Sequence, residues 1–126
     1  MTAKSEPVKR LAKKISLQGE HCQHKVGAVI VKNGRPISTG FNSYKTHPLM
    51  NKKNPLKTTH AEVSAIIRAR KRENIAGATI YVFREHRNGT PALARPCEYC
   101  WAILKEHGIK DVYYTTETEE WGHEKL

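Results

Sequence analysis

Val26-Gly27-Ala28-Val29-Ile30-Val31 is an apolar and largely β-branched run, and it leads through Lys32 into the pair Asn33-Gly34. β-Branched residues are typical of strands, and Asn-Gly is a preferred pair for a two-residue hairpin turn of type I′. Residues 37–42 then return as a second strand. Because Pro36 has no backbone N–H to donate, we expect this second strand to lie at a sheet edge or to begin after Pro36. The stretch therefore predicts a β-hairpin.

Helices and strands on both sides of the hairpin complete the expected fold. Between Ser5 and about Leu17, apolar residues recur at the spacing of an amphipathic helix. The elements expected after the hairpin are a helix from Ala61 to about Glu73, a strand over Ala78–Phe83, a helix begun by Pro96 and ended by Gly108, and a strand over Val112–Thr115. Alternating helices and strands predict right-handed crossovers with parallel pairing. We therefore predict an α/β fold, a three-layer α/β/α sandwich whose mixed sheet has a β-hairpin followed by a parallel β-α-β unit.

The composition excludes several classes of protein. The chain has 126 residues, of which 38% are hydrophobic and 27% charged, as expected for one globular domain. Its longest apolar run, residues 26–31, is too short to span a bilayer, and the N-terminus lacks the apolar core of a signal peptide. We therefore expect a cytoplasmic protein with no membrane partner. The formal net charge of +10 favours anionic partners, without deciding between a nucleotide phosphate and a nucleic-acid backbone.

Two short motifs, His60-Ala61-Glu62 and Pro96-Cys97-Glu98-Tyr99-Cys100, carry candidate metal ligands. A catalytic zinc ion takes three protein ligands and keeps a fourth position for water, and His60, Cys97 and Cys100 are ligands of the right type. The two cysteines lie three residues apart at an expected helix start, where the helix dipole favours thiolates. Glu62 can face the same ion only if His60 lies at the entrance of its helix. The motifs predict a Zn²⁺ site with Glu62 beside it to carry protons.

Two other interpretations of these motifs remain open. The zinc ion could serve only to stabilise the fold, with a fourth ligand drawn from Cys22, His24, His47 and His86. The Cys-x-x-Cys spacing could also be a redox motif, although redox chemistry requires neither His60 nor Glu62.

The two motifs match the H-x-E and P-C-x-x-C signature of zinc nucleobase deaminases. In addition, residues 26–42 resemble the hairpin of the deoxycytidylate (dCMP) deaminase branch of the cytidine deaminase-like family. Gly77–Val82 and Gly108-Ile109 extend this resemblance over most of residues 20–115. The resemblance implies that residues 1–126 form a single zinc deaminase domain with a cytidine deaminase-like fold.

The resemblance also implies a role for particular residues. It makes His60, Cys97 and Cys100 the zinc ligands and Glu62 the residue that transfers protons. Asn42 is implied to hydrogen-bond the sugar, the backbone N–H groups of Ala61 and Cys97 to bind the base, and Pro96 to shape the approach of the base. The implied reaction is attack of an activated water on an amidine carbon, followed by loss of ammonia.

The sequence departs from the family pattern in three places. Residues 41–48 replace a shorter turn, so the resemblance does not carry over the family's regulation by nucleotide triphosphates. A long basic loop, residues 84–95, precedes Pro96, and we expect Arg84, Arg87 and Arg95 to lie at the mouth of the site and bind the phosphate of the substrate. The chain ends soon after Thr115, which leaves little room for a further helix and a fifth strand. We therefore expect a sheet that is trimmed or completed by a partner chain, and a homo-oligomer.

The favoured function is deamination of a cytosine nucleotide, dCMP to dUMP plus ammonia. A first alternative is a deaminase that acts on cytosine or adenine in single-stranded DNA or tRNA, because the net charge also suits a nucleic acid. A second alternative is a zinc-stabilised nucleic-acid-binding module without catalysis, and Glu62 argues against it.

Overall fold

The computed structural model describes residues 6–19, 25–43, 60–70 and 74–126. In chain order, its elements are α1 (Glu6–Ser16), β1 (Val26–Lys32), β2 (Arg35–Phe41), α2 (Ala61–Arg70), β3 (Thr79–Arg84), α3 (Glu98–Glu106), β4 (Asp111–Thr115) and β5 (Trp121–Lys125). None of the helices in these described ranges combines the length and the apolar character needed to cross a membrane.

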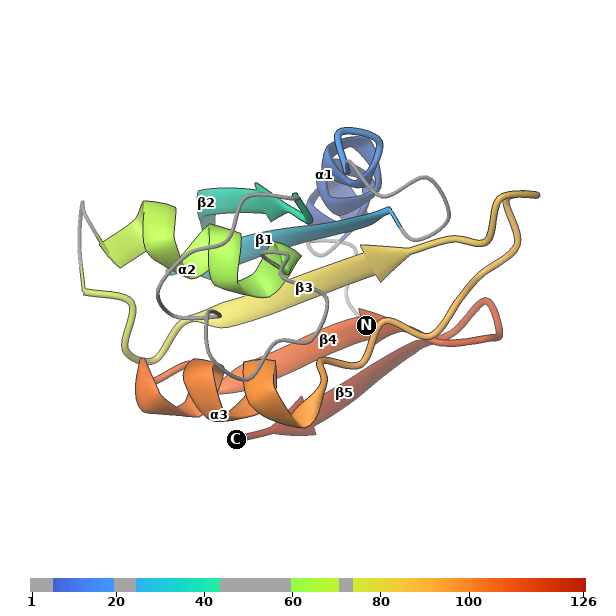
Figure 1. The fold of residues 1–126 in the computed structure, drawn as a ribbon. Coiled ribbons are helices and arrows are strands. Elements are labelled where there is room, and N and C mark those ends of the chain that lie inside the picture. The colour runs from blue at the N-terminus through green and yellow to red at the C-terminus, as the bar shows by residue number, and fades with distance from the viewer. Residues whose placement is uncertain (1–5, 20–24, 44–59, 71–73) are drawn as a thin grey trace.

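The strands form one mixed sheet in the order β2-β1-β3-β4-β5. β1 is antiparallel to both β2 and β3, and β4 is antiparallel to β5. β3 and β4 are parallel, and α3 connects them across one face of the sheet (Figure 1). The predicted hairpin followed by a parallel β-α-β unit is therefore confirmed.

The turn between β1 and β2 has the backbone that its sequence predicts. Asn33 has a φ of 53° and Gly34 a φ of 78°, so both residues adopt the left-handed conformation that a type I′ turn requires. β2 is an edge strand, and its register with β1 shifts between Ile30 and Val31, opposite Pro36. The proline therefore lies at an edge and at an irregularity, as its missing N–H demands.

Helices cover both faces of the sheet. α2 and α3 lie on one face, where fully buried Ile30 and Ile80 of the sheet pack with Ile66 and Leu104 of the helices (Figure 1). On the other face, Val29 and Tyr81 pack with two residues of α1, Val8 and Ala12. The predicted three-layer sandwich is confirmed, and the layer of α2 and α3 carries both candidate metal motifs.

The expectation that the chain leaves little room for a fifth strand is wrong. Trp121–Lys125 forms β5, which follows β4 after a short turn in which the Thr116 hydroxyl donates to the Glu120 carbonyl at 2.6 Å. Trp121 packs on the same face as Tyr81, with ring centroids 6.1 Å apart. Apart from this tryptophan the strand is polar, so its pairing with β4 and the packing of Trp121 override a weak local preference. The chain itself supplies the strand that a partner was expected to supply.

Candidate metal centre and active site

The N-termini of α2 and α3 bring the two motifs together. The Ser64 N–H donates to the His60 carbonyl at 3.0 Å, so His60 occupies the capping position of α2, as Glu62 requires. Cys97 is the capping residue of α3, and its sulfur accepts from the Cys100 N–H at 3.5 Å. α3 thus begins two residues later than Pro96 predicts. The chain therefore places one imidazole and two thiols at two neighbouring helix N-termini.

A glycine in β2 allows α2 to approach the sheet closely. A Cβ at Gly40 would meet the backbone nitrogen of Ala65 and lie 2.5 Å from the carbonyl oxygen of Ala61. Only a residue without a side chain permits this approach. Gly40 therefore sets the height of the first turn of α2, and with it the position of His60.

The distances between the three candidate ligands fit a zinc ion. His60 Nδ1 lies 3.1 Å from Cys100 Sγ and 3.8 Å from Cys97 Sγ, and all three ligand atoms lie within 4.8 Å of one another. Tetrahedral Zn²⁺ with ordinary bond lengths would separate a nitrogen and a sulfur ligand by about 3.5 Å. The donor set and its spacing are therefore those of a three-ligand zinc site.

The thiols and the imidazole shift each other's pKa. Hydrogen bonds with Cys100, and then with His60, lower the pKa of Cys97 to about 3. The hydrogen bond to Cys97 also raises the pKa of Cys100, as does the burial of this thiol. The hydrogen bond with Cys97 raises the pKa of His60, against the effect of burial. A thiolate at Cys97 gives the cluster the negative charge that attracts a divalent cation.

Glu62 is a buried acid beside this cluster. It is 5% exposed, and its burial raises the pKa of its carboxyl, while the charge of His60 opposes this shift. Burial of a carboxyl is costly, so the position of Glu62 next to the candidate ligands indicates a chemical task rather than packing. A raised pKa suits a group that must both accept and return a proton near neutral pH.

The described residues supply three ligands and no fourth. The metal-binding group in these ranges consists of His60, Cys97 and Cys100. His86, one of the four candidates for a fourth ligand, instead contacts Glu117, with 3.0 Å between Nε2 and Oε2. The other three candidates, Cys22, His24 and His47, lie outside the described residues.

The residues expected to contact the base and sugar surround the same end of the sheet. Asn42 follows β2, and its side-chain oxygen accepts from the Val26 N–H at 3.0 Å, which fixes the orientation of the amide. Ala61 is the first residue of α2, where backbone N–H groups have no partner within the helix. Pro96 is fully buried directly before Cys97.

The three arginines expected to bind phosphate have different surroundings. Arg84 donates to the Leu93 carbonyl at 3.2 Å and so holds the loop after β3. Arg95 pairs through two nitrogens with Glu124 of β5, at 2.6 and 3.2 Å, and its guanidinium lies 4.4 Å from the centre of the Trp101 ring. Arg87 is exposed and has no ion pair with another described residue. The structure therefore does not group the three side chains, and it leaves Arg87 available.

A family model described as the cytidine and deoxycytidylate deaminase zinc-binding region matches residues 2–116. The chain belongs to this family. A zinc ion is the cofactor of the family, and His60, Cys97 and Cys100 are the described residues of this member that could hold it. The predicted resemblance to the cytidine deaminase-like family is confirmed.

Individual proteins resemble the chain to different degrees. An uncharacterized deaminase in the luxG 3' region of Aliivibrio fischeri is 34% identical over 108 residues, which cover 77% of this chain and 65% of that protein. The dCMP deaminase from the cyanophage S-TIM5, in complex with dCMP and dUMP, is 27% identical with a TM-score of 0.67, over 90% of this chain and 82% of that one. A cytidine deaminase from Burkholderia pseudomallei is 20% identical with a TM-score of 0.70, over 99% of this chain and 93% of that one. This last similarity supports the fold alone.

Two features of this family member escaped prediction from its sequence. Lys25 lies beside the loop after β3. Glu124 of β5 accepts a hydrogen bond from Arg95, close to Cys97 in the chain. Both are single charged residues in polar surroundings, and the sequence carries no signal of their partners.

Proposed function

We propose that the chain catalyses the zinc-dependent hydrolytic deamination of a cytosine nucleotide, with dCMP to dUMP plus ammonia as the favoured reaction. The observation that carries the proposal is the buried carboxyl of Glu62 beside the cluster of His60, Cys97 and Cys100. A zinc ion that only stabilised the fold would need no buried acid next to it. The similarity to a phage dCMP deaminase supports the choice of a cytosine nucleotide.

The metal and the acid would divide the chemistry between them. When bound, Zn²⁺ supplies acidity to a water molecule that can then attack C4 of the cytosine ring. Glu62 would take a proton from this water on a carboxylate oxygen and pass it to the ring nitrogen next to C4. It would then take the remaining proton from the oxygen added at C4 and give it to the leaving amino group. Ammonia departs as the C4 oxygen becomes a carbonyl. The buried surroundings of Glu62 exclude bulk water from these transfers.

The remaining contacts belong to the same proposal. Asn42 would bind the sugar, and the N–H groups of Ala61 and Cys97 would bind the base, with Pro96 fixing the backbone before Cys97. Of the three arginines first assigned to the phosphate, Arg87 keeps that role. Arg84 and Arg95 instead hold the loop after β3 and the start of α3. We also retain the proposal that the protein is a homo-oligomer.

A panel of substrates tests the function. Zinc-loaded protein is incubated with dCMP, cytidine, dCTP, single-stranded DNA and tRNA, and ammonia release is followed. We expect dCMP to be turned over best. Turnover of DNA or tRNA without turnover of dCMP would favour the alternative of a nucleic-acid deaminase. The net charge of +10 supports this alternative, because it attracts the phosphate backbone of a nucleic acid.

Substitution of Glu62 tests the mechanism. We expect Glu62→Gln to bind one zinc ion per chain and to lose about 100-fold or more in kcat, because only proton transfer is removed. Zinc content by metal analysis is the control. Activity within a few-fold of the parent enzyme would show that Glu62 does not transfer the proton, and loss of both zinc and activity would point to a structural role.

A further inference from the structure

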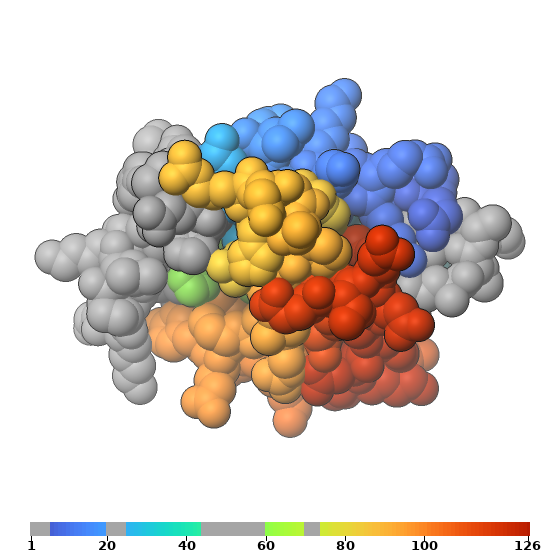
Figure 2. Space-filling model, turned by 90° about the vertical axis from the view of Figure 1, so that its right-hand side faces the viewer, coloured from blue at the N-terminus to red at the C-terminus, as the bar shows by residue number. Residues whose placement is uncertain are grey.

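A pocket of about 390 Å³ lies outside the metal cluster, between the end of α1, the residue before β1 and the loop after β3. Its charged lining residues are Lys25, Glu85, His86 and Arg87, and we call it the basic pocket. Figure 2 faces this side of the molecule and shows the loop after β3 between α1 and the turn that joins β4 to β5. The volume falls in the range of about 300–1,000 Å³ that is typical of small-molecule sites.

The charges in the basic pocket do not cancel. Glu85 is paired with Lys13 of α1 at 3.7 Å, and His86 is paired with Glu117 at 3.0 Å. Each of these two groups therefore has a partner of its own. Lys25 and Arg87 have no ion pair with any residue in the described part of the chain. Two cations thus remain in one pocket, and an anion is the ligand that would compensate them.

The turn that carries Arg87 is ordered by hydrogen bonds. The His86 N–H donates to the Thr90 carbonyl and the Gly89 N–H donates to the His86 carbonyl, each at 2.9 Å. The Asn88 side chain accepts from the Thr90 N–H at 3.1 Å, and Gly89 has the positive φ of 86° that closes the turn. Arg87 therefore extends from a preorganised turn, which lowers the entropic cost of binding a ligand.

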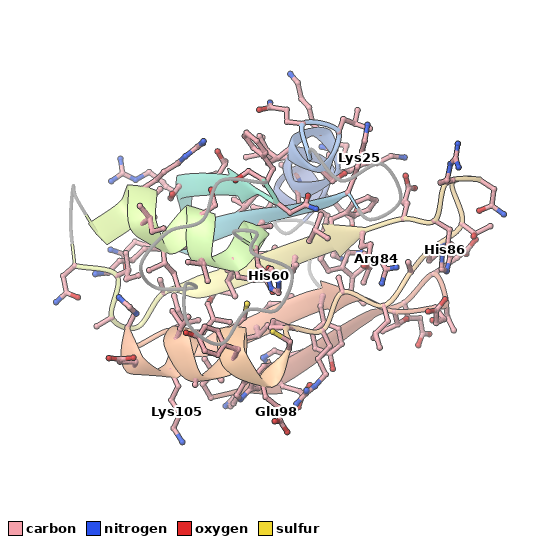
Figure 3. The ribbon with its side chains drawn as sticks, in the orientation of Figure 1. Lys25, His60, Arg84, His86, Glu98 and Lys105 are labelled. Carbon is pink, nitrogen blue, oxygen red and sulfur yellow. The ribbon has the colours of Figure 1, made fainter. Side chains whose placement is uncertain are left out.

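The basic pocket is linked through the start of β1 to Asn42, the residue assigned to the sugar. Lys25 directly precedes Val26, the first residue of β1. The Val26 N–H donates to the side-chain oxygen of Asn42, and Val26 pairs with Arg84 of β3. In Figure 3, His60, Arg84 and His86 follow one another from the centre toward the right-hand end of the molecule, and Lys25 lies above them. A ligand that places its base at the metal cluster and its sugar at Asn42 would extend toward this pocket.

We propose that the basic pocket binds a phosphate group of the substrate through Lys25 and Arg87. This inference rests on the proposed function. The phosphate is either the 5′-phosphate of a free nucleotide or the phosphate beside the target nucleotide in a single strand, and both present the same anionic oxygens. Arginine and lysine side chains bind such oxygens through charge-assisted hydrogen bonds.

A pair of double variants tests the pocket without any turnover. Lys25→Gln with Arg87→Gln removes both cations of the basic pocket. Lys105→Gln with Lys110→Gln is the matched control, because it removes the same charge from exposed residues at the end of α3 and just after it. Figure 3 shows Lys105 on the side of the molecule away from Lys25. Calorimetry then measures the binding of dUMP and of deoxyuridine, which differ only by the phosphate, to each zinc-loaded protein.

We expect the parent protein to bind dUMP more tightly than deoxyuridine. The pocket variant should bind dUMP about 10- to 100-fold more weakly, which corresponds to the loss of charged hydrogen bonds, and should bind deoxyuridine as the parent does. The control variant should keep the parent's affinity for both ligands. Equal losses in both variants, or a parent that does not distinguish dUMP from deoxyuridine, would overturn the proposal. If the variants bind dUMP and deoxyuridine as expected but no substrate is deaminated, the proposed function is wrong and the assignment of the basic pocket to phosphate still stands.

The salt dependence of binding separates the two sources of phosphate. We compare dUMP with a single-stranded oligonucleotide that carries one deoxyuridine. If the phosphate belongs to a strand, affinity for the oligonucleotide should fall steeply with salt, and the pocket variant should flatten its logarithmic slope by about 1.4. If the phosphate belongs to a free nucleotide, the oligonucleotide should bind no better than dUMP. The oligonucleotide could also bind the parent tightly while the pocket variant shows the same salt dependence of affinity. In that case its phosphates are bound elsewhere, and the proposal is contradicted.

Discussion

Replacement of Gly40 by alanine should move the metal centre without touching a ligand. Gly40 is buried in β2 under the first turn of α2. A Cβ there would meet the backbone nitrogen of Ala65 and lie 2.5 Å from the Ala61 carbonyl oxygen, where ordinary contact begins at 3.4 Å. Both obstructing atoms belong to the backbone, so no side chain can rotate away. The helix start, and His60 immediately before it, must move by about 0.9 Å, the difference between these two distances.

This displacement sets the size of the expected effect. Overpacking of a well-packed site costs about 1–3 kcal/mol of unfolding free energy. A misplacement of about 1 Å at a reacting centre can cost about 100-fold in rate. We therefore expect Gly40→Ala to lower the free energy of unfolding by about 1–3 kcal/mol and to lower kcat/KM by about 10- to 100-fold. Urea unfolding and steady-state ammonia release measure the two quantities.

Gly27→Ala is the matched control. A Cβ at Gly27 would meet the backbone of α1, at the Ala12 carbonyl oxygen and the Ser16 nitrogen, on the opposite face of the sheet. It should lower stability by a similar amount, about 1–3 kcal/mol, and leave kcat and zinc affinity close to those of the parent. Parent-like activity in Gly40→Ala, or equal losses of activity in both variants, would refute the argument that Gly40 positions the metal centre.

Three further predictions concern the metal and the contact between Arg95 and Glu124. Removal of zinc by a chelator should lower the Tm by about 10 °C or more, measured by circular dichroism, and an unchanged Tm would mean that the metal does not stabilise the native state. Arg95→Ala should speed the release of zinc to a competing chelator and leave the KM for dCMP unchanged, whereas a large rise in KM would return Arg95 to the phosphate. The hydrogen bond from Arg95 lowers the pKa of Glu124, so this contact stabilises the fold above the usual glutamate pKa of about 4.3 and loses its effect as the pH falls through the lower, folded-state pKa. Glu124→Gln should therefore abolish an acid transition in tryptophan fluorescence that the parent shows, and a parent without this transition would contradict the assignment.

The hairpin could be predicted from sequence because its signals are local. The apolar run of residues 26–31 and the pair Asn33-Gly34 each dictate a backbone conformation without reference to the rest of the chain. β5 could not be predicted in this way, since only Trp121 carries a strong preference for a strand. Gly122 suits its position in β5 because of its neighbour in the sheet: a Cβ there would lie 2.6 Å from the ring of Tyr114 in β4. The evidence for β5 is therefore in its partner strand.

The candidate site also has a part that the sequence predicts and a part that depends on tertiary structure. The candidate ligands His60 and Cys97 could be identified because the chemistry of a zinc ligand resides in the residue type and its spacing. The fate of a surface arginine depends on which acid the fold brings near it. Arg95 and Glu124 are 29 positions apart, and their pairing follows from the register of β5, which the sequence does not disclose. Charge along the sequence therefore predicted an anionic partner but not the residues that would bind it.

A chain of contacts joins the fifth strand to the metal centre. Glu124 of β5 accepts from the Tyr114 hydroxyl of β4 at 2.7 Å and from Arg95, whose guanidinium also lies over Trp101 of α3. The Trp101 N–H in turn donates to the Cys97 carbonyl at 2.8 Å, within the first turn of α3. The side-chain contacts are partly exposed and weak alone, but neighbouring contacts share residues, so loss of one partner leaves the others free to move. The last strand of the chain therefore holds the start of the helix that carries two of the three candidate ligands.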